Sequence, residues 1–150
     1  MSLHVSIEIF DALHELLRIF RTRMRQSLES VSPDLTFGEL RVLMHVGEHP
    51  DCAQKALVER CHVDKAQMAR LLAQLEDKGW LTRSESTKDR RVRQLHLSTQ
   101  GQRLFRQLGA RRAELAAELL KDCPGPVQSQ LLELLAQARD SALQAPSTDS

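Results

Sequence analysis

Apolar residues recur every three or four positions in two long stretches, one toward each end of the chain. The first stretch covers residues 6–30 and the second covers residues 99–143. This spacing predicts amphipathic helices, each with a continuous apolar stripe. The stripe of the first helix consists of Phe10, Leu13, Leu17, Phe20, Met24 and Leu28. Stripes of this length favour packing against partner helices, so we expect the two stretches to form a dimer interface.

The second stretch is predicted to contain two helices. Thr99 is expected to cap the first of them, and Gln102 is expected to complete a capping box three residues later. The Pro-Gly-Pro segment at residues 124–126 interrupts the helical pattern. Beyond it, the apolar face of the final helix consists of Val127, Leu131, Leu134, Leu135 and Ala138.

The middle of the chain, residues 36–98, has a different organisation, with shorter elements. Thr36 is expected to cap a helix that closes near Gly47. A short helix at residues 54–61 and a longer one at residues 64–78 follow, joined by a tight connection. Two helices joined in this way are typical of a helix-turn-helix, whose second helix enters the major groove of DNA.

The helix at residues 64–78 has defined ends and two different faces. Asp64 is expected to cap its start with Gln67 completing a capping box, and Gly79 is expected to end it in the left-handed conformation. One face carries the apolar residues Met68, Leu71, Leu72 and Leu75. The opposite face carries Ala66, Arg70, Ala73 and Asp77, with Gln67 and Gln74 flanking them. A face of this kind fits a major groove, where glutamine and arginine side chains read base edges.

Two strand patterns follow this helix. Residues 80–84 and residues 92–98 are expected to form strands, and the polar, basic loop 85–91 joins them. Such a hairpin, with a basic loop at its tip, is able to reach a groove next to the one that the helix occupies. The fold class predicted is mainly α, with a small β-hairpin wing.

The distribution of charge agrees with this interpretation. The net charge of the 150 residues is only +1, but residues 54–96 contain ten Lys and Arg against six Asp and Glu, a local charge of +4. Residues 1–53 contain five against eight, a local charge of −3. Positive charge therefore collects in the segment that is predicted to bind DNA, as contacts to phosphates require.

Several short motifs, in this order and at this spacing, are similar to those of a known family. They are Asp64-Lys65, Leu75-Glu76-Asp77-Lys78-Gly79-Trp80, Asp89-Arg90-Arg91 and Leu97-Ser98-Thr99-Gln100-Gly101. With them the chain resembles the multiple antibiotic resistance regulator (MarR) family of bacterial winged helix-turn-helix proteins. The resemblance covers roughly residues 10–140, and its detailed matches lie in residues 55–101.

The resemblance implies an obligate homodimer that binds a pseudo-palindromic site in double-stranded DNA. It places Arg91 at the tip of the wing, entering the minor groove, with Asp89 positioning the loop. Gln67 and Arg70 would read bases, while Lys65 and Lys88 would bind phosphate, as would Arg90. The full set of expected DNA-binding residues is Lys65, Ala66, Gln67, Arg70, Gln74, Lys88, Asp89, Arg90 and Arg91.

One departure from the family concerns base preference. Ala66, Gln67 and Ala69 stand where relatives often carry serine or threonine. The operator sequence of a relative therefore does not transfer to this chain.

The resemblance also implies a signal. A small, often aromatic or phenolic, effector would bind between the dimerisation helices (about 6–30 and 99–143) and the DNA-binding part (about 36–98), and would release a repressor from its operator. No cofactor and no enzymatic activity are expected, because catalytic motifs such as a phosphate-binding glycine loop or His-Glu-x-x-His are absent from the sequence. With no apolar run near the roughly 18 residues of a membrane span, we expect a single-domain cytoplasmic protein and no membrane contact.

Two alternatives stay open from the sequence. A metal- or thiol-responsive regulator of the same fold would use residues from the set His45, His49, Cys52, Cys61, His62 and Cys123. Against this, the three cysteines form no Cys-x-x-Cys pair, and Cys61 lies on an apolar face and is expected to be buried. A winged-helix module for protein partners, without specific DNA binding, is the other alternative.

Overall fold

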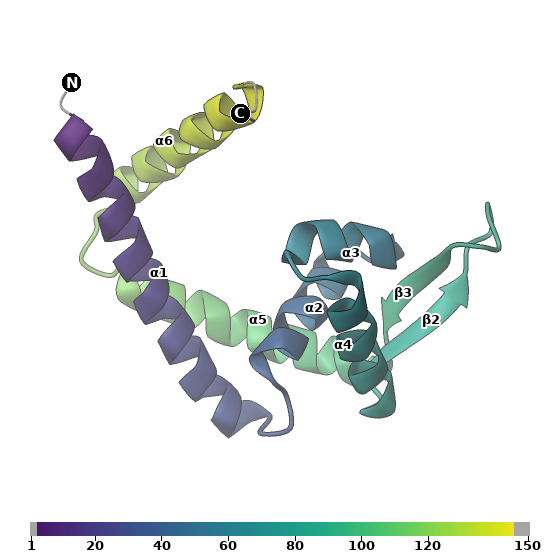
Figure 1. Ribbon diagram of the computed structural model, residues 1–150. Coiled ribbons are helices and arrows are strands. Elements are labelled where there is room, and N and C mark those ends of the chain that lie inside the picture. Colours follow the sequence, from purple (N-terminus) through teal and green to yellow (C-terminus); the bar gives the residue numbers. More distant parts are fainter. Residues whose placement is uncertain (1–2, 146–150) are drawn as a thin grey trace.

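A computed structural model describes residues 3–145, which form six helices and three short strands (Figure 1). In chain order the elements are α1 (Leu3–Val31), α2 (Phe37–Glu48), β1 (Cys52–Ala53), α3 (Gln54–Cys61), α4 (Lys65–Asp77), β2 (Leu81–Glu85), β3 (Arg93–Leu97), α5 (Thr99–Leu119) and α6 (Gly125–Gln144). The predicted class, mainly helical with a small wing and long terminal helices, is confirmed. We call the segment from α2 to β3 the winged-helix part.

The hydrophobic core lies in the winged-helix part and under the first half of α5. Its fully buried side chains include Leu43, Leu57, Met68, Leu72, Leu75, Leu95 and Leu108. Met68, Leu72 and Leu75 come from the face of α4 that the sequence pattern assigned to the core. Each buried side chain of this size contributes about 1.5–3 kcal/mol to folding, so burial of this face fixes which side of α4 is exposed.

The three strands form one antiparallel sheet in the order β1-β3-β2. Leu81 pairs with Leu97 and Glu85 with Arg93, so the two strands of the wing are in register along their whole length. The predicted strands each differ from the observed ones by a residue at the ends. β1 was not predicted, because a strand of two residues is too short to show an alternating pattern. It is recognised only by its pairing with β3, where Cys52 lies opposite Leu95.

The caps of α2 and α4 are largely those that the sequence predicts. Thr36 and Glu39 form a full capping box at the start of α2. The Asp64 carboxylate accepts a hydrogen bond of 2.7 Å from the Gln67 backbone N–H, while the described residues show no return bond from the Gln67 side chain. Gly79 has φ +78, the left-handed conformation that ends the helix and turns the chain toward β2.

The predicted cap of α5 is wrong by one residue. Ser98, not Thr99, is the N-cap, and its hydroxyl accepts a hydrogen bond of 3.0 Å from the Gly101 backbone N–H. The extended backbone of Ser98 (ψ 172) places Thr99 inside the first helical turn. Both residues are good caps, and the end of β3 at Leu97 decides between them.

Most of α1 and the whole of α6 lie apart from this core, whereas Leu28, near the end of α1, belongs to it. Part of α1 packs against α5, whereas the first turns of α1 and the whole of α6 stand clear of the winged-helix part (Figure 1). Helix α6 has no buried residue in the single chain. Among residues 3–145, no helix combines the length and apolarity needed to cross a membrane.

Candidate nucleic-acid interface

The exposed face of α4 carries the residues that the sequence nominated for the major groove. These exposed residues are Lys65, Ala66, Gln67, Arg70 and Gln74. Alanine and glutamine keep this face narrow, and the N-terminal turn, capped by Asp64, is free to approach a base pair. All five nominated α4 side chains are therefore accessible from solvent.

Two features fix the turn before α4: a residue in the left-handed conformation and a hydrogen bond from an arginine side chain to the backbone. His62 ends α3 in the left-handed conformation, with φ 52 and ψ 40. The Arg41 guanidinium of α2 donates a hydrogen bond of 2.8 Å to the Cys61 carbonyl oxygen, which is one of the free carbonyls at the end of α3. This hydrogen bond attaches the end of α3 to α2, close to the turn that leads into α4.

The far end of α4 is held by an ion pair at the edge of the core. The Lys78 ammonium lies 2.7 and 2.9 Å from the two carboxylate oxygens of Glu39, whose side chain is only 1% exposed. Lys78 also donates to the Asp34 carbonyl oxygen, and Glu39 accepts from the Thr36 backbone N–H at 3.0 Å. This pair joins the end of α4 to the start of α2.

Arg83 joins the wing to the helix-turn-helix. From β2 its guanidinium forms an ion pair with Glu76 of α4 and lies 3.5 Å from the Gln54 amide oxygen of α3. Because the planar Arg83 side chain contacts both helices, it fixes the position of the base of the wing relative to α4.

The base of the wing is closed by a second group of polar residues. His96 of β3 lies with Nδ1 2.8 Å from an Asp51 carboxylate oxygen and with Nε2 2.6 Å from the Ser84 hydroxyl. Asp51 itself has φ 67, an uncommon conformation for a residue other than glycine. The chain Asp51–His96–Ser84 connects the segment before β1 with both strands of the hairpin.

The wing loop is ordered by its own side chains. The Asp89 carboxylate accepts a hydrogen bond of 3.0 Å from the Arg91 backbone N–H, which is an Asx turn. The Ser86 hydroxyl likewise accepts one of 3.2 Å from the Lys88 backbone N–H. Asp89 thus positions the backbone of Arg91, while the exposed Arg91 side chain forms no ion pair or hydrogen bond within the part of the chain that the structure describes.

Five basic side chains of α4 and the wing are available to DNA. Among residues 3–145 none of the five forms an ion pair with the protein, and all are exposed: Lys65, Arg70, Lys88, Arg90 and Arg91. Unpaired cations on one surface are what contacts to phosphates need.

A cavity of about 520 Å³ lies between α1, the winged-helix part and α5. Its apolar lining consists of Leu17, Phe20, Met24, Phe37, Leu40, Met44 and Cys61. Its charged and polar lining consists of Arg21, Arg25, Arg41, His45, Glu48, Arg60 and Arg112. With five arginines against one glutamate, the charged part of the cavity is strongly positive. The Arg25 guanidinium stacks over the Phe37 ring, 4.8 Å from its centroid.

Two of the three cysteines, Cys52 and Cys61, have the environment of structural thiols. Cys61 is 4% exposed, and burial raises the pKa of the Cys61 and Cys52 thiols. A raised pKa leaves less of the reactive thiolate at neutral pH, which does not favour thiol sensing by either residue. Among the described residues considered for metal binding, only His45 and His49 join a group of closely spaced metal-ligand side chains, and Glu48 completes it.

Comparison with known proteins agrees with this geometry. A model of the MarR family matches residues 34–92, which contain the helix-turn-helix and most of the wing. The transcriptional regulator HosA of Escherichia coli O157:H7 is 29% identical over 94 residues, which cover 63% of this chain and 69% of HosA. Over residues 34–92 the chain is therefore similar to the MarR family. Its fold is a winged helix-turn-helix.

Two solved structures of the MarR fold are similar over nearly the whole chain. A putative MarR family transcriptional regulator from Listeria monocytogenes, complexed with 26mer DNA, has a TM-score of 0.73 at 16% identity and covers 94% of this chain and 89% of its own. The PcaV transcriptional regulator from Streptomyces coelicolor, in complex with its natural ligand, has a TM-score of 0.59 at 24% identity and covers 93% and 92%. At these identities the two structures show that the MarR fold is shared.

Sequence reasoning missed the residues that position this candidate interface. Arg83, the Lys78–Glu39 pair and the His96 group all join elements that lie far apart in the chain. The one local signal was Glu39, three residues after Thr36, which marks a capping box but does not reveal its second partner, Lys78.

Proposed function

We propose that this chain is a MarR-family regulator, namely a homodimeric repressor that binds a pseudo-palindromic operator and leaves it when a small anionic effector binds. The observation that carries the proposal is the exposed polar face of α4 beside a braced wing, with five unpaired basic side chains on the same surface. In this proposal Gln67, Arg70 and Gln74 read bases, with Ala66 leaving room for the approach.

The wing completes the proposed contact. Arg91 enters the flanking minor groove, and Asp89 holds the loop that presents it. Lys65, Lys88 and Arg90 bind phosphates, which fixes the register without reading sequence. The Listeria relative, solved with 26mer DNA, supports a DNA complex for this fold.

Exposed apolar faces on the terminal helices support the homodimer. On α1 the exposed side chains include Val5, Ile7, Ile9, Phe10, Leu16 and Leu17. On α6 they include Val127, Leu131, Leu132, Leu134 and Leu135. Two such faces exceed what a monomer normally leaves in water. A two-fold dimer through α1 and α6 would also provide the second α4 that a site with half-sites about 34 Å apart requires.

The cavity supports a small anionic effector. Its apolar part accepts an aromatic ring, while Arg21, Arg25 and Arg112 at its charged part favour a carboxylate or phenolate. Because α1 lines one side and the winged-helix part the other, a ligand that separates them changes the distance between the two α4 helices. PcaV, which has this fold, was solved in complex with its natural ligand, and this supports a ligand site.

The decisive experiment is fluorescence anisotropy on DNA from upstream of the gene, with scrambled DNA in parallel and a salt series. We expect wild-type binding to be specific and to weaken with salt, and Arg91→Ala to lower operator affinity about tenfold. Lys121→Ala, which removes an exposed charge between α5 and α6, is the matched control and should bind as wild type does.

Unchanged operator affinity in Arg91→Ala would refute the role of the wing. Equal and weak binding of both DNAs, followed by failure to select any sequence from random DNA, would instead favour a module for protein partners. Salicylate serves as a probe of the cavity: it should raise the thermal midpoint of wild type, and Arg25→Ala should reduce that shift.

A further inference from the structure

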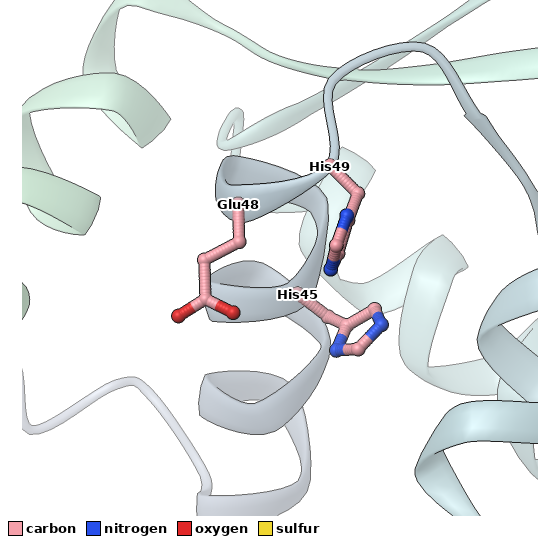
Figure 2. Close-up of side chains that lie close together, drawn as sticks. All are labelled: His45, Glu48 and His49. Atoms are coloured by element: carbon pink, nitrogen blue, oxygen red, sulfur yellow. The ribbon is translucent and has the colours of Figure 1, made fainter.

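The last turn of α2 carries three side chains of the kind that bind metal ions. His45 and His49 are four residues apart and therefore lie on one face of the helix, with Glu48 beside them (Figure 2). Their ligand atoms all lie within 4.8 Å of one another. Two histidines at this spacing on a helix are a recurrent way to hold a zinc ion.

The two imidazole rings already converge on a cation. The Arg60 guanidinium of α3 lies with one nitrogen 2.8 Å from His49 Nε2 and 3.5 Å from His45 Nε2. Arginine has donors only, so both Nε2 atoms accept, and each directs its lone pair at the same nitrogen. The ring centroids are 4.9 Å apart, which keeps both lone pairs within reach of one bound ion.

Glu48 supplies a carboxylate that a metal ion is able to recruit. It is exposed, and its pairing with Arg112 of α5 is long, at 3.4 Å. Exposed ion pairs of this kind contribute little to stability, so the carboxylate is able to exchange partners at small cost. The site is open to solvent on this side, which gives an ion a route of entry.

We propose that His45, Glu48 and His49 bind one divalent transition-metal ion, such as Zn²⁺, in competition with the guanidinium of Arg60. Two imidazoles and a carboxylate are a known ligand set for Zn²⁺, and three protein ligands leave a position for water. Metal binding would break the contacts between Arg60 of α3 and the two histidines. The ion would instead be held by residues 45–49 at the end of α2.

Competition with Arg60 gives the proposal a distinctive consequence. Arg60 occupies the lone pairs and also repels a second cation, and Arg41 and Arg112 add to the positive field. Removing Arg60 therefore increases the affinity for metal, although it removes a contact of the folded protein. A set of residues with only a structural role would not respond in this direction.

The test is titration of Zn²⁺ into the full chain, purified without a histidine tag, by competition with a chromogenic chelator. We expect one ion per chain in wild type, and a loss of affinity of about tenfold or more in His45→Asn and in His49→Asn. Arg60→Ala is expected to bind Zn²⁺ several-fold more tightly than wild type. Circular dichroism of each variant confirms that it is folded.

His62→Asn is the matched control. His62 is an exposed histidine outside the group, and asparagine tolerates its left-handed backbone. It should bind Zn²⁺ as wild type does. Wild-type affinity no higher than that of the folded His45→Asn, His49→Asn double variant overturns the site, and unchanged or weaker binding in Arg60→Ala overturns the competition.

Discussion

The ion pair between Lys78 and Glu39 allows the sharpest prediction about how the winged-helix part is held together. Glu39 is 1% exposed and depends on Lys78 and the Thr36 backbone N–H for its partners. Lys78→Met keeps an unbranched apolar side chain of similar length and removes the ammonium. The variant therefore leaves the Glu39 carboxylate buried without its counter-charge.

The size of the effect follows from the distance and the exposure. Opposite charges 2.7 Å apart attract by about 6 kcal/mol at an effective dielectric constant of about 20. Lys78 is 31% exposed, so water screens the pair on that side, which reduces the net value. Breaking a fully buried pair costs about 3–5 kcal/mol, so for this half-buried one we expect the free energy of unfolding to fall by about 2–4 kcal/mol.

Urea unfolding followed by circular dichroism measures this loss, at one fixed protein concentration because a dimer's stability depends on concentration. Lys65→Met is the matched control, since Lys65 is an exposed lysine of the same helix without an ion pair, and we expect a change within about 0.5 kcal/mol. Adding Glu39→Gln to Lys78→Met should recover part of the loss, because the neutral amide needs no counter-charge. Equal stability of Lys78→Met and Lys65→Met would refute the reasoning.

Two further predictions concern the packing of α5 and the buried thiols. A Cβ at Gly101 would lie 2.1 Å from the Trp80 carbonyl oxygen, so Gly101→Ala should lower the free energy of unfolding by about 2 kcal/mol or more. A Cβ at Gly109 would have no atom within 4 Å, so Gly109→Ala should raise the free energy of unfolding by up to about 1 kcal/mol. The same urea titration measures both changes. Because burial raises the pKa of Cys52 and Cys61, both should react with iodoacetamide at pH 7.5 more slowly in the folded protein than in urea, as peptide mass spectrometry will show. Equal rates in the two states would contradict the assignment of these cysteines as structural thiols.

The sequence predicts α4 well because its determinants are local. A capping carboxylate at Asp64, a left-handed glycine at Gly79 and apolar residues at helical spacing all act within one or two turns. Once Met68 and Leu72 are assigned to the core, the opposite face must be exposed. That assignment predicts the exposure of Ala66 and Arg70, with Gln67 and Gln74 beside them, whereas Lys65 was nominated from the family resemblance.

The contacts that orient α4 and the wing could not be predicted in this way. Arg83 reaches Gln54, 29 residues away in the sequence, and Lys78 reaches Glu39, 39 residues away. Periodicity reports which side of an element is buried, but it does not report which polar residues meet across elements. The same reason explains the metal group, where the sequence offered six candidate histidines and cysteines and only the fold brings Glu48 into the set.

Helix α2 is the element through which a bound ligand would act on the DNA interface. Its first turn holds the end of α4 through Glu39, its Arg41 holds the end of α3, and its last turn carries the histidines that contact Arg60. Its middle lines the cavity beside α1. A ligand in the cavity or an ion on the last turn therefore acts on the helix to which both members of the helix-turn-helix are attached. Since α2 is packed on the core by fully buried residues, it is expected to move as a rigid body and to carry α3 and α4 with it.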